Sequence, residues 1–337
     1  MDRDEGLGIG GRQSGWICQE RPGQIIVESA ILLMEGLGEA LFDNLESFFA
    51  PGFLATKGDR HPDDGWSLDR RDPKVIQSFM PLWEWAYHHY FRVQTDGWHH
   101  VLPEGKMLVV GSHNGGLATP DMFMFMYDWF RRQGFDRLTY GLMHPTVWEI
   151  FPEMVVRQAA QCGAVRAHPK MAIAALQKGA TVLVYPGGPE DVFRPHHLRD
   201  KIYFAGRQGF IKLALRENAP ILPIISYGAH DTLFVMADIY KEMRQLHEDW
   251  GMPWLFGIDP VVFPIYLGLP WGIAFGPWPN LPLPVQIHTR ICAPVVFERY
   301  GREAAGDRQY VNQCYQLVCT QMQQSLDQLI AQVGDRS

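Results

Sequence analysis

A histidine and an aspartate lie close together in residues 111–121, which read Gly-Ser-His-Asn-Gly-Gly-Leu-Ala-Thr-Pro-Asp. A neutral imidazole oriented by a carboxylate is a common arrangement for removing a proton from a hydroxyl group near neutral pH. His113 and Asp121 therefore predict a general base and its partner, and group transfer is the first hypothesis. The alternative for the same residues is a turn histidine followed by an aspartate that caps the next helix.

The elements around this pair place it at the edge of a sheet. Residues 107–110, Met-Leu-Val-Val, predict a short buried strand that ends just before the turn. In open α/β sheets, ligands bind at the carboxyl ends of the strands. The outline Gly-Ser-His-Asn-Gly is that of a nucleophile elbow with histidine in place of serine. Such a turn can activate a substrate's hydroxyl group, but it does not provide one.

Short apolar runs alternate with helical periodicity along the chain, as a βαβ architecture requires. Strands are predicted at residues 107–110, 138–143, 181–185, 221–226 and 285–291, and helices at 73–91, 122–132, 145–161, 170–178, 208–217, 235–250 and 309–333. This order predicts an α/β fold with a mainly parallel or mixed sheet flanked by helices. Residues 1–72 predict an N-terminal helical extension and a linker, ahead of a single domain over residues 73–337.

Composition excludes several classes of function. The chain has 337 residues and a formal net charge of −7, which argues against nucleic acid as a partner. The 5 cysteines are scattered and the 13 histidines show no metal-binding spacing, so we expect neither a metal nor another cofactor. Residues 1–19 lack the apolar core of a signal peptide, and no apolar run is long enough to span a bilayer. We expect a cytoplasmic protein.

Residues 251–284 combine aromatic and aliphatic side chains with many prolines and a single charged residue, Asp259. Proline at this density disfavours both helix and strand, so the apolar side chains must be covered by the domain, by another protein or by lipid. Two explanations stay open, an irregular lid over the core and a surface that contacts a membrane. Tryptophan is favoured at the level of lipid headgroups. This favours peripheral contact with the inner face of a membrane.

Four blocks of the sequence follow one another in a characteristic order, at residues 113–121, 163–166, 185–191 and 220–223. They include His-Asn-Gly-Gly before Asp121, Tyr-Pro-Gly-Gly at 185–188, Gly-Arg-Gln-Gly-Phe at 206–210 and Pro-Ile-Leu-Pro at 220–223. This series resembles the lysophospholipid acyltransferase superfamily, and its branch related to diacylglycerol and phytyl-ester acyltransferases. The resemblance covers residues 106–231 in detail.

The resemblance implies transfer of a fatty acyl group from acyl-CoA or acyl carrier protein to a glycerolipid or another lipid alcohol. The family's histidine, matched by His113, deprotonates the acceptor hydroxyl, and its aspartate, matched by Asp121, holds the ring tautomer. The family usually has four residues between the two, whereas seven lie between them here. Gly115, Gly116 and Pro120 can fold a longer turn back. The alternatives are an acyl thioesterase at the same site and an inactive lipid-binding protein.

The third block bears on the acceptor. Members that use phosphorylated acceptors typically read Phe-Pro-Glu-Gly-Thr-Arg-Ser there, whereas this chain reads Tyr-Pro-Gly-Gly-Pro-Glu-Asp. Glu190 thus stands where a cation is expected, and a carboxylate repels a phosphate. This form, with Gly187 and Gly188, predicts a neutral acceptor. Arg194 lies close by and either restores a phosphate site or belongs to a solvated loop.

The remaining predicted substrate-binding residues are two glycines and two arginines. Gly115 and Gly116 let the backbone come close to a substrate. Arg166 lies near the family's second-block arginine and either faces the same cleft or lies on the surface. Arg207 begins a helix and either meets the phosphates of CoA or anchors the loop.

Overall fold

A computed structural model describes residues 64–254 and 259–334 of the chain. The predicted N-terminal helical extension falls almost entirely outside this part, so it stays a prediction. The predicted helix at residues 73–91 begins as expected with α2 (Pro73–Trp85) and continues as a π-helical segment, Ala86–Tyr90. Asp72 caps α2 by accepting a hydrogen bond from the N–H of Lys74.

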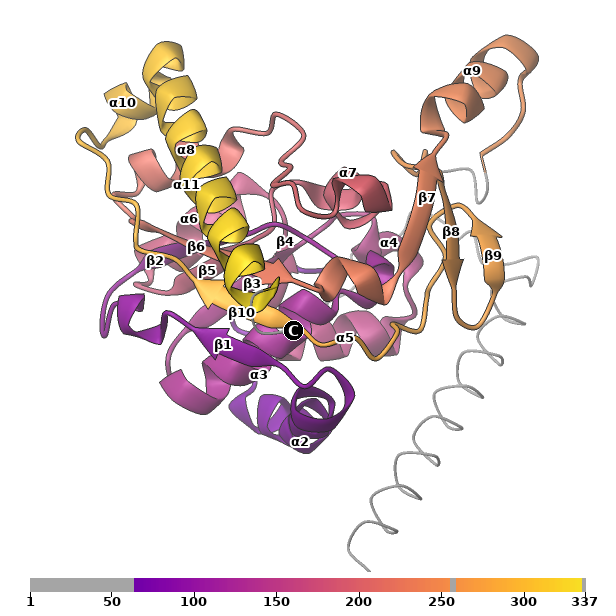
Figure 1. The fold of residues 1–337 in the computed structure, drawn as a ribbon. Helices are drawn as coiled ribbons and strands as arrows, with labels where there is room; N and C mark the ends of the chain where they lie inside the picture. Colours follow the sequence, from indigo (N-terminus) through magenta and orange to yellow (C-terminus); the bar gives the residue numbers. More distant parts are fainter. Residues whose placement is uncertain (1–63, 255–258, 335–337) are drawn as a thin grey trace, which may run out of the picture. The chain divides into compact units, whose positions relative to one another are not determined.

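A seven-stranded mixed sheet forms the centre of the described chain (Figure 1). Its strands lie in the order β1 (Gln94–Asp96), β10 (His288–Ile291), β6 (Ile221–Tyr227), β2 (Met107–Gly111), β5 (Thr181–Val184), β3 (Thr139–Met143) and β4 (Ala164–Arg166). All neighbours pair in parallel except β10 and β6. The predicted α/β class and all five predicted strands are confirmed. Strands β1 and β4 were not predicted, because three residues are too few to show a period.

Helices cover both faces of this sheet (Figure 1). On one face lie α2 and α3 (Pro120–Gln133), which contact Met107 and Val109 of β2. On the other lie α6 (Pro169–Gln177), α8 (Gly209–Arg216) and α11 (Arg308–Gly334), which contact Leu108 and Val110. A strand buried on both faces has to be apolar at every position, which explains the unbroken run of β2.

The helix predicted at residues 145–161 is wrong as one element. The structure has α4 (Val147–Ile150) and α5 (Glu153–Gln161), separated by Phe151 and Pro152. Proline has no N–H for the helical ladder and forces the preceding residue into an extended conformation. Phe151 accordingly has φ −85° and ψ 149°.

A second, three-stranded antiparallel sheet overturns two predictions. The predicted helix at 235–250 is instead strand β7 (Phe234–Asp238) followed by α9 (Tyr240–Trp250). The proline-rich segment 251–284, expected to lack strands, supplies β8 (Pro264–Gly268) and β9 (Gly272–Phe275). Pro264 begins β8 and Pro270 lies in the turn before β9, and the other prolines of the segment lie outside both strands, so none interrupts the ladder.

The two faces of this small sheet are both apolar. Its inner face packs Val235, Tyr266 and Ala274 against Val192 and Phe193, at the end of α7 (Gly188–Val192). Its outer face consists of large side chains that remain exposed, with exposed fractions of 42% for Phe234, 50% for Leu267, 63% for Ile273 and 55% for Phe275. No helix within the described residues is both long and apolar enough to cross a bilayer.

Candidate active site

His113 lies two residues beyond the carboxyl end of β2, on a turn that leads into α3. Gly115 and Gly116 have φ of +83° and +67°, a left-handed conformation that turns the chain back. A Cβ on Gly115 would lie 2.6 Å from Pro120 Cδ and 2.6 Å from Thr232 Oγ1. Both predicted glycines therefore shape the turn that carries His113, and α3 starts directly after it.

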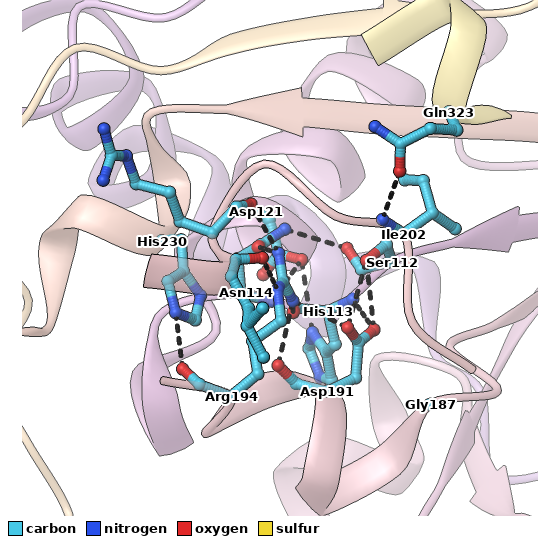
Figure 2. Close-up of polar contacts among 12 residues, drawn as sticks. Ser112, His113, Asn114, Asp121, Gly187, Asp191, Arg194, Ile202, His230 and Gln323 are labelled. Atoms are coloured by element: carbon cyan, nitrogen blue, oxygen red, sulfur yellow. Dashed lines mark hydrogen bonds and ion pairs between the residues drawn. The ribbon is translucent and has the colours of Figure 1, made fainter. Parts of the chain in front are cut away.

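The turn brings His113 and Asp121 together despite the seven residues between them (Figure 2). His113 Nδ1 lies 3.2 Å from Asp121 Oδ2, and the same oxygen accepts the N–H of Asn114 at 3.1 Å. The Asp121 side chain is 1% exposed and that of His113 is 15% exposed. A carboxylate accepting from Nδ1–H favours the tautomer whose lone pair is on Nε2, which is the form a general base needs.

Tyr185 packs against the imidazole of His113, with ring centroids 4.3 Å apart and an interplanar angle of 22°. It follows directly after β5, whose Val184 pairs with Val110 of β2, so Tyr185 lies beside Gly111. A Cβ on Gly111 would lie 2.3 Å from the Tyr185 ring, and glycine is therefore needed there. Burial raises the pKa of Tyr185 well above its usual value, so its hydroxyl stays protonated. Sequence reasoning did not assign Tyr185 a role, although its place after a strand adjacent to β2 was a usable signal.

A buried ion pair between Asp191 and Arg194 lies behind the turn (Figure 2). Asp191 accepts hydrogen bonds from the N–H of His113 and from Ser112 Oγ. Arg194 donates to the backbone oxygen of His113 at 2.8 Å and to Asn114 Oδ1 at 2.6 Å. No local pattern indicates these contacts, since about eighty residues separate the two segments.

The predicted phosphate contact of Arg194 does not fit this position. Its side chain is 4% exposed, and each of its three guanidinium nitrogens donates to protein oxygens. An arginine whose donors are all used inside the protein has none left for a ligand. Arg194 therefore holds the turn and does not face the substrate.

Gly187 and Gly188 let α7 return toward the turn of His113. A Cβ on Gly187 would lie 2.3 Å from Asp191 Cβ and 2.3 Å from the backbone oxygen of Tyr203. Gly188 has φ +58°, in the left-handed region. Both predicted glycines thus allow the close approach that lets Asp191 reach the backbone of His113.

Glu190 and Arg207 form a bidentate ion pair, with Arg207 Nη2 at 2.7 Å from both carboxylate oxygens. Arg207 Nη1 also donates to the backbone oxygen of Gly187 at 2.7 Å. The side chains are 26% and 41% exposed, so the pair remains in contact with solvent. The structure thus joins two residues that were predicted separately, and it favours the anchoring role for Arg207.

Arg166 ends β4, and β5 and β3 lie between that strand and β2. It forms an ion pair with Glu149 at 3.1 Å, and its Nε donates to the backbone oxygen of Asp64 at 3.2 Å. Its guanidinium also lies over the Trp66 ring. The structure therefore does not bring Arg166 together with His113. Within residues 64–254 and 259–334, no group of three or more His, Cys, Asp or Glu side chains is arranged to hold a metal ion.

A family model, several proteins and a solved structure are similar to this chain. The family model described as Diacylglycerol acyltransferase matches residues 66–328. Uncharacterized proteins of Mycobacterium bovis and Mycobacterium tuberculosis are each 26% identical over 264 residues, which is 77% of this chain and 68% of theirs. A mouse protein named Diacylglycerol O-acyltransferase 2-like protein 6 is 23% identical over 157 residues, 45% of each chain. Among solved structures, the 1-acyl-sn-glycerophosphate acyltransferase PlsC of Thermotoga maritima has 15% identity and a TM-score of 0.43, covering 77% of this chain and 80% of that one.

Proposed function

Because the chain belongs to the diacylglycerol acyltransferase family, we propose that it transfers a fatty acyl group from acyl-CoA, or from acyl carrier protein, to a neutral lipid alcohol. His113 is the general base and Asp121 its partner. The observation that carries this proposal is the contact of His113 Nδ1 with the buried carboxylate of Asp121, on a turn at the carboxyl edge of the sheet.

The reaction follows from this geometry in one displacement. Nε2 of His113 takes the proton of the acceptor hydroxyl while its oxygen attacks the thioester carbonyl carbon. The tetrahedral intermediate then collapses, the C–S bond breaks, and the departing thiolate takes the proton back from the imidazolium. Asp121 stabilises the imidazolium between these steps. General-base catalysis of this kind typically contributes about 10²–10⁴-fold in rate.

No acyl-enzyme intermediate is needed. Ser112 is the hydroxyl-bearing residue next to His113 in sequence, but it is 4% exposed and donates its Oγ hydrogen to Asp191. A buried hydroxyl that donates to a carboxylate away from the base is not placed to attack a thioester. This supports direct transfer over a serine hydrolase mechanism and leaves a water-using thioesterase as the enzymatic alternative.

The charges around the turn favour a neutral acceptor. Arg194 is buried and fully bonded, and Arg207 is neutralised by Glu190 through two contacts of 2.7 Å. A phosphate on the acceptor would have to displace Glu190 from Arg207 and would meet its negative charge. The mouse relative's name makes diacylglycerol the first neutral acceptor to test.

Peripheral contact with a membrane is the second part of the proposal. The small sheet begins close to the turn of His113, because Thr232 lies against Gly115 and β7 begins two residues after Thr232. Asn280 Nδ2 also donates to the backbone oxygen of Gly115 at 3.3 Å. An apolar outer face on this sheet would let a lipid substrate pass from the bilayer to His113 over a short path.

The deciding experiment incubates purified protein with labelled palmitoyl-CoA and a panel of acceptors: monoacylglycerol, diacylglycerol, fatty alcohols and lysophosphatidate. We expect a labelled ester with a neutral acceptor and none with His113→Ala. Release of free palmitate alone would instead identify a thioesterase, and the absence of any product would support a lipid-binding protein. Full turnover by a folded His113→Ala variant would overturn the assignment of the base.

A further inference from the structure

We infer that Asp191 and Arg194 act together as positioning residues that hold the backbone of His113 for catalysis. This inference rests on the proposed role of His113 as general base. The pair bonds to both backbone polar groups of this residue. The N–H of His113 donates to Asp191 Oδ2, and its C=O accepts from Arg194 Nη1 at 2.8 Å (Figure 2).

The same ion pair also bonds to the residues on either side of His113, Ser112 and Asn114. Ser112 Oγ lies 3.1 Å and 3.2 Å from the two carboxylate oxygens of Asp191. Asn114 Oδ1 accepts from Arg194 Nη2 at 2.6 Å, and Asn114 Nδ2 donates to the backbone oxygen of Ser112 at 2.9 Å. Residues 112–114 therefore all bond to one ion pair, in which Arg194 Nη1 lies 2.6 Å from Asp191 Oδ1.

The two carboxylates at this site have separate tasks. Asp121 contacts the imidazole ring and so sets its tautomer, whereas Asp191 contacts the peptide that carries the ring. Asp191 is 0% exposed and Arg194 is 4% exposed, so neither side chain reaches a substrate. Their effect on the reaction must pass through the position of His113. A base displaced by about 1 Å from its productive position can lose about 10²-fold in rate.

Stability alone does not explain a charged pair at this position. Burial raises the pKa of Asp191 to about 6, and the opposing effects of Arg194, the His113 N–H and the Ser112 hydroxyl do not restore it. At neutral pH the ionised carboxylate therefore stabilises the fold less than its protonated form would. Buried ion pairs are often less stabilising than neutral replacements, and fixing geometry is one reason to keep them.

Asp128 provides a matched control elsewhere in the chain. It is also 0% exposed and also pairs with an arginine three residues later, Arg131, but its other partners are Arg132, Tyr87 and Thr95. Burial raises its pKa, yet the hydrogen bonds from Thr95 and Arg131 outweigh burial and leave the pKa below its usual value. Its charge therefore stabilises the fold. Neutralising Asp128 should therefore cost more stability than neutralising Asp191.

The test compares Asp191→Asn, Asp191→Ala and Asp128→Asn in the full chain, with palmitoyl-CoA and the fastest acceptor of the panel. Asp191→Ala should lower kcat about 10²-fold and Asp191→Asn by about tenfold, because the amide oxygen can still accept from His113. Both KM values should stay within about twofold, since no substrate contact is removed. Asp128→Asn should lower Tm by more than Asp191→Asn does and leave kcat unchanged.

Arg194→Lys serves as the second variant, because lysine keeps the charge but cannot reach His113 O and Asn114 Oδ1 together. It should lower kcat with unchanged KM, as Asp191→Asn does. The inference is overturned if folded Asp191→Asn and Arg194→Lys keep kcat within about twofold of wild type, or if KM changes and kcat does not. A parallel assay of His113→Ala distinguishes failure of this inference from failure of the proposed function. An inactive His113→Ala beside a fully active Asp191→Ala would reject the positioning role of Asp191 and retain His113 as the base.

Discussion

His113 Nδ1 and Asp121 Oδ2 lie 3.2 Å apart, although the turn between the two residues is longer than the family's usual spacing. The first turn of α3 begins at Pro120, so Asp121 points back toward β2 from the start of a helix. Gly115 and Gly116, both at positive φ, absorb the additional length. The longer turn therefore still brings the imidazole and the carboxylate into contact.

Asp121→Asn tests the role of this carboxylate. The amide can donate to Nδ1, which favours the tautomer without a lone pair on Nε2 and removes the charge that stabilises the imidazolium. We expect kcat to fall by about 10²-fold or more, with KM for both substrates within about threefold. Steady-state kinetics over a range of both substrates measures this. An unchanged kcat beside a raised KM would place Asp121 in substrate binding instead.

The ion pair of Glu190 with Arg207 predicts a change of acceptor preference. Glu190→Gln frees the Arg207 guanidinium, and Glu190→Arg adds a second cation, so both should favour a phosphorylated acceptor. We expect the ratio of kcat/KM for lysophosphatidate over diacylglycerol to rise about tenfold, corresponding to roughly 1.4 kcal/mol. Competition between the two acceptors in mixed micelles measures this ratio directly.

Glu248→Gln is the matched control, because Glu248 also pairs with an exposed arginine, Arg244, but within α9 and outside the main sheet. It should leave the ratio unchanged. A wild-type enzyme that acylates lysophosphatidate about tenfold faster than every neutral alcohol would contradict the predicted acceptor class.

The outer face of the small sheet predicts binding to lipid vesicles. Replacing Leu267, Ile273 and Phe275 together by serine removes three large exposed apolar side chains, each worth about 1.5–3 kcal/mol when fully buried. Cosedimentation with phosphatidylcholine vesicles should weaken at least about tenfold, while secondary structure by circular dichroism stays unchanged.

A control for general hydrophobicity replaces three exposed apolar residues on other elements, Val155, Val296 and Leu317, by serine. This variant should still sediment with vesicles. Wild-type protein that remains wholly in the supernatant at low salt would exclude the membrane contact.

His230 predicts how stability changes with acidity. Burial, followed by the positive charge of Arg194, lowers the pKa of His230 to about 3, while its Nε2 hydrogen bonds to the backbone oxygen of Arg194 at 2.8 Å. A histidine that stays neutral in the folded state contributes stability above its unfolded pKa of about 6.5, and that stability is lost as pH falls toward 3. The loss from this residue should reach about 2 kcal/mol at pH 5.

His230→Gln isolates this effect, because glutamine keeps a donor for Arg194 O but does not titrate. Urea unfolding at pH 7.5 and pH 5 should show the wild type losing about 2 kcal/mol more than the variant. Protonation of Asp191 stabilises the folded state at pH 5, because its pKa is raised in that state. This contribution is the same in both proteins and cancels when their losses of stability are compared. Parallel pH curves for the two proteins would assign the acid sensitivity to other groups.

Local patterns were sufficient for five of the seven strands of the main sheet and for the placement of His113 and Asp121 at its edge. Buried strands such as β2 and β6 appear as unbroken apolar runs, and glycines mark the turn that follows β2. The prediction was wrong where two local signals conflicted. Apolar residues at helical spacing led to a helix in place of β7, and the high proline content led to no strand at β8 and β9. β7 pairs with β8 about thirty residues away along the chain, whereas β9 pairs with β8 across a short turn.

The sequence by itself determined an α/β protein with a histidine and an aspartate on one turn after a buried strand, because strand burial and turn formation depend on neighbouring residues. Only the tertiary structure decided which charges meet. Arg194 donates to the backbone oxygen of His113, Glu190 forms an ion pair with Arg207, and the Tyr185 ring packs against the imidazole. These contacts join segments separated by 17 to 81 residues, and which of several charged side chains becomes buried or paired depends on how the strands and helices pack.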